Sequence, residues 1–216
     1  MCGILFSYSK SKPIDINKFT RALELQKHRG PDSTNVKVLK NNILFGHVRL
    51  SIIDLTKNSD QPIINESTSN ILIFNGEIYN FIELKEKMSK EGISFNSKGD
   101  GEVLLKSIEK YGIDSINDFN GMWAFVFYDS KKNELIISRD RFGKKPLYYY
   151  QDENYFIVSS EIKSIFSLLE KDRILNKEFL NVFLTFGYWP NDSEETFYKN
   201  IKQIMPGVTA RVNLNY

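Results

Sequence analysis

The sequence predicts a mixed α and β fold in which helices cover the faces of β-sheets. Segments with the branched and aromatic composition of strands alternate along the chain with segments whose apolar residues recur at helical spacing. The chain has 216 residues, enough to bury one sizeable core, and no internal repeat divides it. We therefore expect a single α+β domain.

The first half of the chain is predicted to contain five strands and three helices. The strands are expected at residues 2–8, 36–39, 43–45, 50–53 and 71–74, which are rich in branched apolar residues. Asp15 is expected to cap a helix that runs to Lys27. Its buried side chains are predicted to be Ile16, Phe19, Leu23 and the stem of Gln26. Two amphipathic helices are predicted over residues 79–90 and 102–111, each ending before a glycine.

The second half is predicted to begin with one antiparallel group of strands. Its four members are residues 122–128, 134–138, 146–150 and 155–159, joined by short polar turns. Two short helices are expected at residues 161–169 and 177–185, the second capped by Asn176. Residues 189–192 are expected to form a loop, and a last strand is predicted at residues 208–212.

The composition excludes several classes of protein. The chain carries 29 Lys and Arg residues against 27 Asp and Glu, a formal net charge of +2. A nucleic-acid partner is therefore not favoured, and the pair Lys144-Lys145 is interpreted as solvated surface. The sequence contains no run of eighteen apolar residues, so no membrane-spanning segment is predicted. One cysteine and two histidines cannot form a disulfide framework or a zinc site, so we expect a protein of the reducing cytoplasm.

Cys2 is the only cysteine and directly follows Met1. Because the side chain of Cys2 is small, we expect Met1 to be removed, which leaves one residue with both a thiol and a free α-amine. The reference pKa of that amine is about 7.7–8.0 and that of a thiol about 8.5, so part of the amine can accept the thiol proton near neutral pH. Nucleophile and general base then share one residue. The alternative is a small buried side chain at the start of a strand.

Five short motifs occur in order along the chain. They are Met1-Cys2-Gly3-Ile4, His28-Arg29-Gly30-Pro31-Asp32, residues 46–54 (GHVRLSIID), Asn75-Gly76-Glu77-Ile78-Tyr79-Asn80 and Gly99-Asp100-Gly101-Glu102. Together they resemble the glutaminase domain of the class II, N-terminal-nucleophile glutamine amidotransferases. Residues 138–149 (SRDRFGKKPLYY) and 159–163 (SSEIK) look like the asparagine synthetase branch of that family.

The resemblance implies a four-layer αββα sandwich, in which two antiparallel sheets lie between helical layers and the nucleophile starts a central strand. It also implies that residues 1–205 form the glutaminase domain. Residues 206–216 are then expected to begin a linker to a synthetase domain that this chain lacks. The Ser-Gly-Gly-x-Asp-Ser loop with which that branch binds ATP does not occur in the sequence.

The same resemblance assigns nine residues to catalysis or to glutamine binding. They are Cys2, Arg49, Leu50, Ile52, Ile53, Asn75, Gly76, Glu77 and Asp100. Asn75 and Gly76 are expected to form an oxyanion hole. Arg49 is expected to hold the α-carboxylate of glutamine, because a guanidinium binds a carboxylate through two parallel hydrogen bonds. Glu77 and Asp100 are expected to bind the α-ammonium, and the backbone from Leu50 to Ile53 completes the pocket.

Several of these residues have a simpler interpretation when taken alone. Asn75-Gly76 is typical of a type I′ hairpin turn, although a helix instead of a returning strand is predicted after it. Arg49 alone is typical of a surface charge, and Asp100 between two glycines is typical of a turn. Their joint occurrence favours the binding site.

Other charged residues near these motifs are expected to be structural. A catalytic dyad of Cys2 with His28 or His47 is less favoured, because the α-amine already serves as the base. Two ion pairs are predicted to stabilise the surroundings of the site, Arg29 with Asp32 and Arg139 with Asp140.

The resemblance implies hydrolysis of L-glutamine to glutamate and ammonia through a thioester on Cys2. The ammonia is expected to pass to a synthetase domain in the same chain or in a partner, with asparagine synthesis as the default. No metal or cofactor is expected in this domain, since ATP and magnesium belong to the synthetase domain. The expected partners are L-glutamine and the synthetase domain, without nucleic acid or membrane, and a homodimer is left open.

Three other functions remain open from the sequence. The first is a non-catalytic domain that senses glutamine or docks onto a synthetase. The second is the glutaminase half of an enzyme that amidates a sugar or another carboxylate. The third is an N-terminal-nucleophile hydrolase for a different amide, against which the clamp of Arg49, Glu77 and Asp100 argues.

Overall fold

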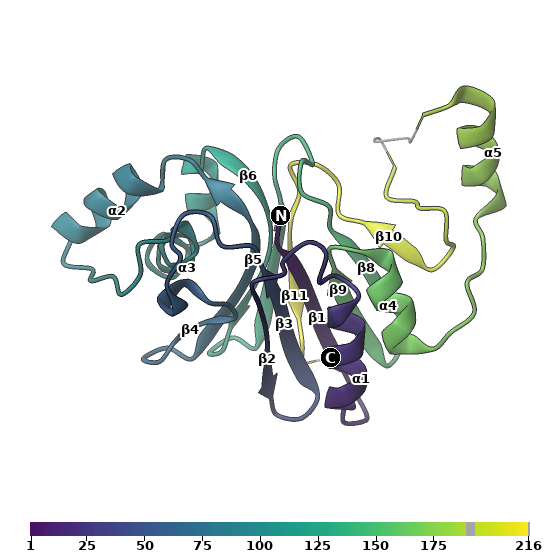
Figure 1. The fold of residues 1–216 in the computed structure, drawn as a ribbon, viewed down its shortest axis with the longest axis horizontal. Helices are drawn as coiled ribbons and strands as arrows, with labels where there is room; N and C mark the ends of the chain where they lie inside the picture. The colour runs from purple at the N-terminus through teal and green to yellow at the C-terminus, as the bar shows by residue number, and fades with distance from the viewer. Residues whose placement is uncertain (189–192, 216) are drawn as a thin grey trace.

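Two antiparallel sheets form the centre of the computed structural model, which describes residues 1–188 and 193–215 (Figure 1). The six-stranded sheet has the order β10-β8-β9-β1-β3-β2, and the five-stranded sheet has the order β11-β7-β6-β5-β4. The strands of the first are β1 (Gly3–Ser9), β2 (Ser33–Leu39), β3 (Ile43–Arg49), β8 (Tyr148–Gln151), β9 (Tyr155–Ser159) and β10 (Ile201–Gln203). Those of the second are β4 (Ile63–Asn65), β5 (Asn70–Ile78), β6 (Gly121–Asp129), β7 (Glu134–Arg139) and β11 (Thr209–Asn213).

Helices lie outside the two sheets. They are α1 (Ile16–Glu24), α2 (Phe81–Lys90), α3 (Asp100–Tyr111), α4 (Ile162–Leu169) and α5 (Lys177–Phe186), with short 3-10 helices at Lys57–Ser59 and Ile113–Asp118. In Figure 1, α2 and α3 lie beside the five-stranded sheet, α1 and α4 lie beside the six-stranded sheet, and α5 lies apart at the upper right.

Alternation along the strands produces three buried layers. Side chains such as Phe6, Phe45 and Ile73 meet between the two sheets, whereas residues one step along, such as Leu5 and Leu72, face the helices. Burial of these apolar surfaces is the main force that holds the layers together. The four-layer αββα sandwich expected from the resemblance is therefore confirmed.

Helix α1 begins where its cap predicts and ends early. Asp15 Oδ1 accepts hydrogen bonds from the backbone N–H groups of Asn17 (2.8 Å) and Lys18 (3.3 Å), which satisfies two free donors of the first turn. Phe19 and Leu23 are buried as predicted, but Ile16 is 47% exposed. The helix ends at Glu24 because the chain then tightens into turns. Gln26 lies in these turns and is fully buried. Its Nε2 donates hydrogen bonds to Ile4 O (3.2 Å) and to Ser159 Oγ (3.0 Å), which fixes the start of β1.

The predicted strand at residues 50–53 is wrong. Strand β3 ends at Arg49, because its register pairs Val48 with Gly3, the first residue of β1, and Arg49 with Ser33, the first residue of β2. Neither neighbour continues, so residues 50–53 find no strand partner and form a loop. The short strands β4 and β10 were not predicted, because three residues leave no recognisable alternation.

The four strands predicted as one group belong to two sheets. The hairpin of β6 and β7 lies in the five-stranded sheet, and that of β8 and β9 lies in the six-stranded sheet. Residues 140–147 cross between them. Asp140 organises this crossing, since its carboxylate accepts hydrogen bonds from the backbone of Phe142, Lys144 and Lys145 at 2.9–3.0 Å. Arg139 binds backbone carbonyls, including that of Lys145 (2.8 Å), so the predicted ion pair of Arg139 with Asp140 is replaced by bonds to the backbone.

The segment expected to begin a linker at residue 206 is part of the sandwich up to residue 215. Strand β11 pairs with β7 along its whole length, and Leu214 is 5% exposed in the core between the sheets. The alternating apolar residues 208, 210 and 212 indicated a strand, but the sequence did not show that a sheet edge was free to receive it. The loop predicted at residues 189–192 lies outside the described residues.

Candidate functional site

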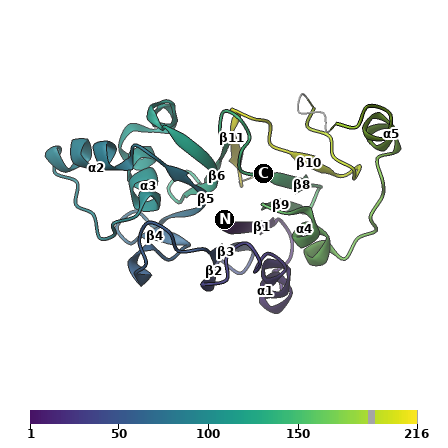
Figure 2. The same cartoon turned by 45° about the horizontal axis from the view of Figure 1, so that its top comes forward.

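The N-terminus of the chain lies near the centre of the molecule (Figure 2), and Cys2 directly precedes Gly3, the first residue of β1. Arg29 Nε donates a hydrogen bond to Cys2 O (2.9 Å), and Arg29 Nη1 binds Glu161 Oε1 (3.2 Å). Leu50, the first residue after β3, brings its N–H to 3.4 Å from Cys2 Sγ and its carbonyl oxygen to 3.7 Å. The thiol is therefore held between the start of one strand and the loop that follows the next.

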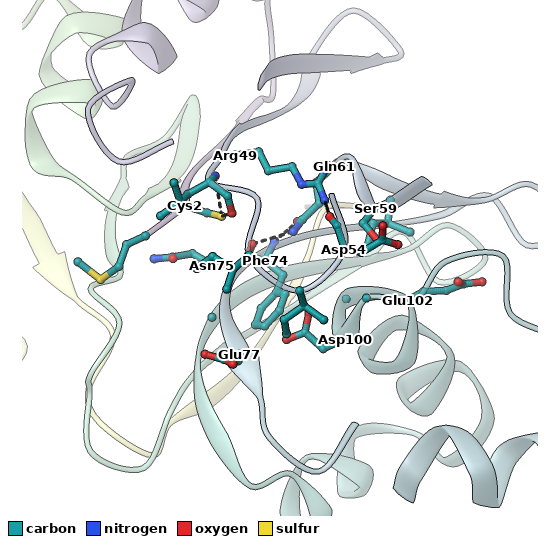
Figure 3. A pocket seen from close by; sticks show the side chains of 18 of the residues that line it. Cys2, Arg49, Asp54, Ser59, Gln61, Phe74, Asn75, Glu77, Asp100 and Glu102 are labelled. Carbon is teal, nitrogen blue, oxygen red and sulfur yellow. Dashed lines mark hydrogen bonds between the residues drawn. The ribbon is translucent and has the colours of Figure 1, made fainter. Parts of the chain in front are cut away.

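A cavity of about 190 Å³ opens beside Cys2 (Figure 3). All nine residues that the resemblance assigned line it: Cys2, Arg49, Leu50, Ile52, Ile53, Asn75, Gly76, Glu77 and Asp100. They come from the residue before β1, from β3, β5 and α3, and from the loop after β3. Residues almost one hundred positions apart in sequence thus share one small polar space.

Asn75 and Gly76 lie inside β5 and do not form a hairpin turn. Asn75 pairs with Ala124 of β6, and Gly76 pairs with Trp123. Asn75 is 1% exposed, yet neither its Nδ2 nor its Oδ1 has a hydrogen-bond partner among the described residues. A buried amide without partners is unfavourable for stability, and the cavity is the space from which a partner can come.

The N–H of Gly76 points away from β6. Phe74 and Ile78, two positions before and after Gly76, show the direction of its N–H group. Their own N–H groups bind Gln61 Oε1 (2.6 Å) and Asp100 Oδ2 (2.9 Å), on the side of β5 where the short strand β4 has ended. Gly76 has the same parity in the strand, so its N–H faces the same open side. A Cβ atom at this position would lie 2.3 Å from Met122 O, so only glycine fits.

Arg49 is a buried residue and not a surface charge. It is 7% exposed, and its guanidinium binds the loop that covers the cavity. Nη1 donates to Thr56 O (2.8 Å) and to Asp60 Oδ1 (2.7 Å), and Nη2 donates to Asp54 O. These three bonds leave Nε–H and one N–H of Nη2 without a partner in the described part of the chain.

Asp54 stabilises the same loop. Its carboxylate accepts hydrogen bonds from Thr56 N (2.9 Å), Thr56 Oγ1 (2.7 Å), Ser59 Oγ (2.8 Å) and Lys98 N (2.9 Å). The bonds from Thr56, Lys98 and Ser59 hold the pKa of Asp54 well below its usual range. Because Lys98 lies just before α3, Asp54 ties the loop after β3 to the segment that carries Asp100.

Two carboxylates face the cavity from opposite elements. Asp100 is the first residue of α3, where a negative charge is favourable, and it binds the N–H of Ile78. Burial raises the pKa of Asp100 to about 6, with Glu77 adding to the increase. Within the described residues, no ion pair involves Glu77 or Asp100. Asp100 therefore lies at a helix start and not in an isolated turn. Because neither carboxylate is ion-paired in the described part of the chain, both are available to a cation.

The two histidines do not line the cavity. His47 is completely buried, with Nε2 3.2 Å from Phe74 O, and burial lowers its pKa to about 3. His28 lies at the surface, 2.9 Å from Glu161. The predicted ion pair of Arg29 with Asp32 does not form in the described part of the chain. Arg29 binds Glu161 instead, and Asp32 accepts a hydrogen bond from Ser51 N (2.7 Å).

The sequence interpretation did not assign several residues that line this cavity. Asp54, Gln61 and Phe74 line the cavity and position its polar groups. Lys145, interpreted as solvated surface, is 5% exposed and also lines it, whereas its neighbour Lys144 is exposed. The apolar Pro146-Leu147 pair that follows was the only local signal for burial of Lys145.

Two further properties can be stated for residues 1–188 and 193–215. In that part of the chain, no three His, Cys, Asp or Glu side chains are grouped so as to hold a metal ion. None of its helices combines the length and the apolar composition that crossing a membrane requires.

Comparison with known proteins identifies the family. The family model of the glutamine amidotransferase domain matches residues 1–215. The chain is 40% identical to putative asparagine synthetase [glutamine-hydrolyzing] 2 of Methanocaldococcus jannaschii, over 99% of this chain and 44% of that protein. It is 36% identical to asparagine synthetase [glutamine-hydrolyzing] 1 of Bacillus subtilis, over 96% of this chain and 33% of that protein. The chain belongs to the glutamine amidotransferase domain family, and it spans less than half the length of these relatives.

A solved structure supports the fold. The glutamine phosphoribosylpyrophosphate amidotransferase of B. subtilis, in complex with ADP and GMP, superposes with a TM-score of 0.67 at 20% identity. The match covers 78% of this chain and 44% of that chain. The resemblance stated from the motifs is thereby confirmed for the family and for the fold.

Proposed function

We propose that this domain hydrolyses L-glutamine to L-glutamate and ammonia through a thioester on Cys2. The observation that carries the proposal is a cavity that the sole cysteine shares with the buried amide of Asn75 and the carboxylates of Glu77 and Asp100. Among the described residues, that amide has no hydrogen-bond partner and those carboxylates form no ion pair. Each feature corresponds to one requirement of amide hydrolysis: a nucleophile, an oxyanion site and a cation-binding site for the substrate.

The reaction begins with removal of Met1, which frees the α-amine of Cys2. This amine takes the proton from Sγ, and the thiolate attacks the side-chain carbonyl carbon of glutamine. The carbonyl electrons move to oxygen, and the resulting oxyanion accepts hydrogen bonds from Asn75 Nδ2 and Gly76 N–H. Loss of the C–N bond, with the proton returned from the ammonium, releases ammonia and leaves a γ-glutamyl thioester.

Water completes the cycle. The α-amine takes a proton from water as its oxygen attacks the thioester, and the C–S bond breaks to release glutamate and restore the thiol. Glutamine and water are thus consumed, and glutamate and ammonia are formed. The N–H of Leu50, 3.4 Å from Sγ, stabilises the thiolate that leaves in this step.

The remaining residues of the cavity recognise the free amino acid. Glu77 and Asp100 bind the α-ammonium, and the two unengaged donors of Arg49, Nε–H and one N–H of Nη2, bind the α-carboxylate side by side. The loop through Leu50, Ile52 and Ile53 covers the bound substrate. A primary amide without an amino acid head group would leave these charges unpaired, which disfavours it.

The ammonia is proposed to serve asparagine synthesis. The support is that both relatives compared above are named glutamine-hydrolysing asparagine synthetases and extend well beyond the aligned domain. Their additional length is where we propose the synthetase function, in the same chain or in a partner. The hydrolysis itself is proposed to need neither ATP nor magnesium, so EDTA should leave glutamate release unchanged.

The proposal is tested on protein whose intact mass shows loss of Met1. Glutamate and ammonia release are measured for the wild type and for Cys2→Ala, which should have no activity. A glutamine-like diazo ketone should label Cys2 covalently. Equal turnover by both proteins would contradict the proposal. Binding of glutamine without turnover by the wild type would instead indicate a sensing domain, and Arg49→Ala with unchanged affinity would remove the carboxylate contact.

A further inference from the structure

Lys145 is a buried cation beside Cys2 that the proposed reaction does not use. It is 5% exposed and lines the cavity together with Met1 and Cys2. Its backbone is fixed on both sides, because its N–H binds Asp140 Oδ2 (3.0 Å) and its carbonyl oxygen accepts from Arg139 Nε (2.8 Å). No hydrogen bond or ion pair to a described residue involves Nζ.

Burying an ammonium group without a partner is unfavourable, and an apolar side chain would fill the same space at lower cost. Three contrasts show that the position is unusual. Lys144 next to it is exposed, Arg29 is neutralised by Glu161, and Arg49 is paired with Asp60. Among the described residues, Lys145 brings to the cavity a positive charge that has no direct ion-pair partner, although Glu77 and Asp140 act on it through space. Its burial therefore indicates a functional reason.

The charge acts on the N-terminal end of the chain. Burial lowers the pKa of the Met1 amine from its usual value, the Cys2 thiol opposes the decrease, and Lys145 and Arg29 add to it. Lys145 also interacts with the thiol, since Cys2 counteracts the decrease that burial causes in the pKa of Lys145. Along the chain, the nitrogen of Cys2 lies between the Met1 amine and the Cys2 thiol. Once Met1 is removed, the Lys145 ammonium should therefore act on the new α-amine of Cys2.

Other charged groups surround the same point. Arg49 of β3 and Asp100 of α3 act on the Cys2 thiol with opposite signs, and Glu77 of β5 and Asp140 act on Lys145. Glu161 lies in contact with Arg29 and, on its outer side, with Lys163 and the exposed His28. A test of Lys145 therefore has to compare variants that leave all of these groups in place.

We propose that Lys145 is a positioning residue for the nucleophile, whose unpaired ammonium keeps the α-amine of Cys2 in its uncharged, proton-accepting form at neutral pH. The inference rests on the proposed function, because only a free α-amine at Cys2 needs such control. A free amine with its reference pKa of about 7.7–8.0 is mostly protonated at pH 7 and cannot accept the thiol proton. A second ammonium beside it disfavours the protonated form, so the uncharged base prevails at lower pH.

The direct test follows the ionisation of Cys2 itself. Because the chain has a single cysteine, cysteine labelled with 13C at Cβ gives one NMR signal that reports the amine and the thiol. The titration is recorded for Met1-free wild type, Lys145→Met, Lys145→Arg and the exposed control Lys144→Met. We expect the amine step of Lys145→Met to move up by about one pH unit, with Lys145→Arg and Lys144→Met close to the wild type.

The pH profile of kcat, at saturating glutamine, provides the second readout. On the acid limb of the profile, where kcat rises with pH, a shift of about one pH unit in the amine titration lowers the kcat of Lys145→Met about tenfold. At higher pH the kcat of this variant should return to the wild-type value. An unshifted titration, or an equal shift in Lys144→Met, would overturn the inference. A lower kcat at every pH without a shift would mean a structural role. If Lys145→Met does not fold, Lys145→Gln replaces it in the comparison with Lys145→Arg.

The outcome is separable from that of the proposed function. The NMR titration needs no turnover. If the wild type releases no glutamate but the amine step still moves in Lys145→Met, the result would contradict the glutaminase proposal alone. A wild type that hydrolyses glutamine while its amine titrates independently of residue 145 would contradict the role of Lys145 alone.

Discussion

Asn75→Leu should increase stability and abolish most of the activity. Leucine has nearly the shape of asparagine but no polar atoms. Asn75 is 1% exposed, and within residues 1–188 and 193–215 neither of its side-chain polar atoms has a hydrogen-bond partner. A buried polar atom without a partner costs about 1–3 kcal/mol. Because both atoms border the cavity, we expect the free energy of unfolding to rise by about 1–2 kcal/mol. Loss of one oxyanion donor should lower kcat by about 10²–10³.

Asn70, at the other end of β5, provides a matched control. It is also buried, but its side chain is fully engaged: Nδ2 donates to Glu109 Oε1 (2.8 Å) and Oδ1 accepts from Ser130 N (2.9 Å). Asn70→Leu leaves the backbone N–H of Ser130 without its acceptor and removes one of the two donors to Glu109 Oε1, which keeps its bond from Thr68 Oγ1 (2.6 Å). The free energy of unfolding should therefore fall by about 1–3 kcal/mol. The value of kcat should not change, since Asn70 does not line the cavity.

The two variants are compared by urea unfolding and by glutamate release at saturating glutamine. Opposite changes in stability, together with an activity loss confined to Asn75→Leu, would support a catalytic amide. The reasoning would be refuted if Asn75→Leu lost as much stability as Asn70→Leu, because Asn75 would then be a structural residue, or if it kept the wild-type kcat.

Three further predictions concern the same cavity. Gly76→Ala should lower glutamate release at least about 100-fold, because a Cβ 2.3 Å from Met122 O displaces the strand that carries the N–H; unchanged kinetics would contradict this. Asp54→Asn should lower the free energy of unfolding by about 2 kcal/mol and raise KM, because amide hydrogens would face the donors Ser59 Oγ and Lys98 N; urea titration and kinetics measure both. For Asp100, with a pKa of about 6 in the folded protein, protonation should raise KM as the pH falls through 6. The folded state also binds this proton more tightly than the unfolded state, so stability should increase from pH 6 towards pH 4, and Asp100→Asn should show neither pH dependence.

Local signals predicted most of the secondary structure. The cap at Asp15, the apolar spacing of α3 and the branched residues of β5 act within a few residues, so they can be recognised in the sequence. The errors arose where distant neighbours decide. Residues 50–53 have strand composition but no partner strand, and β7 and β8 are neighbours in sequence that join different sheets.

The site was predictable as a set of motifs but not as a network of contacts. The motifs identified the nine residues that line the cavity, and the structure shows them together. The burial of Lys145 depends on the turn that Asp140 builds between the two sheets, and the fixation of Gly76 depends on Gln61 taking the place of a missing strand. Such contacts depend on the tertiary arrangement, so no local pattern in the sequence reveals them.

The most direct test of the mechanism is the mass of the protein trapped during turnover. Protein is mixed with glutamine, quenched in acid within the first turnovers and digested, and the N-terminal peptide is analysed. We predict a peptide that begins at Cys2 and carries one γ-glutamyl group on sulfur, absent from Cys2→Ala. Full glutaminase activity in protein whose N-terminal peptide still begins with Met1 would contradict the mechanism, because its α-amine would be in a peptide bond.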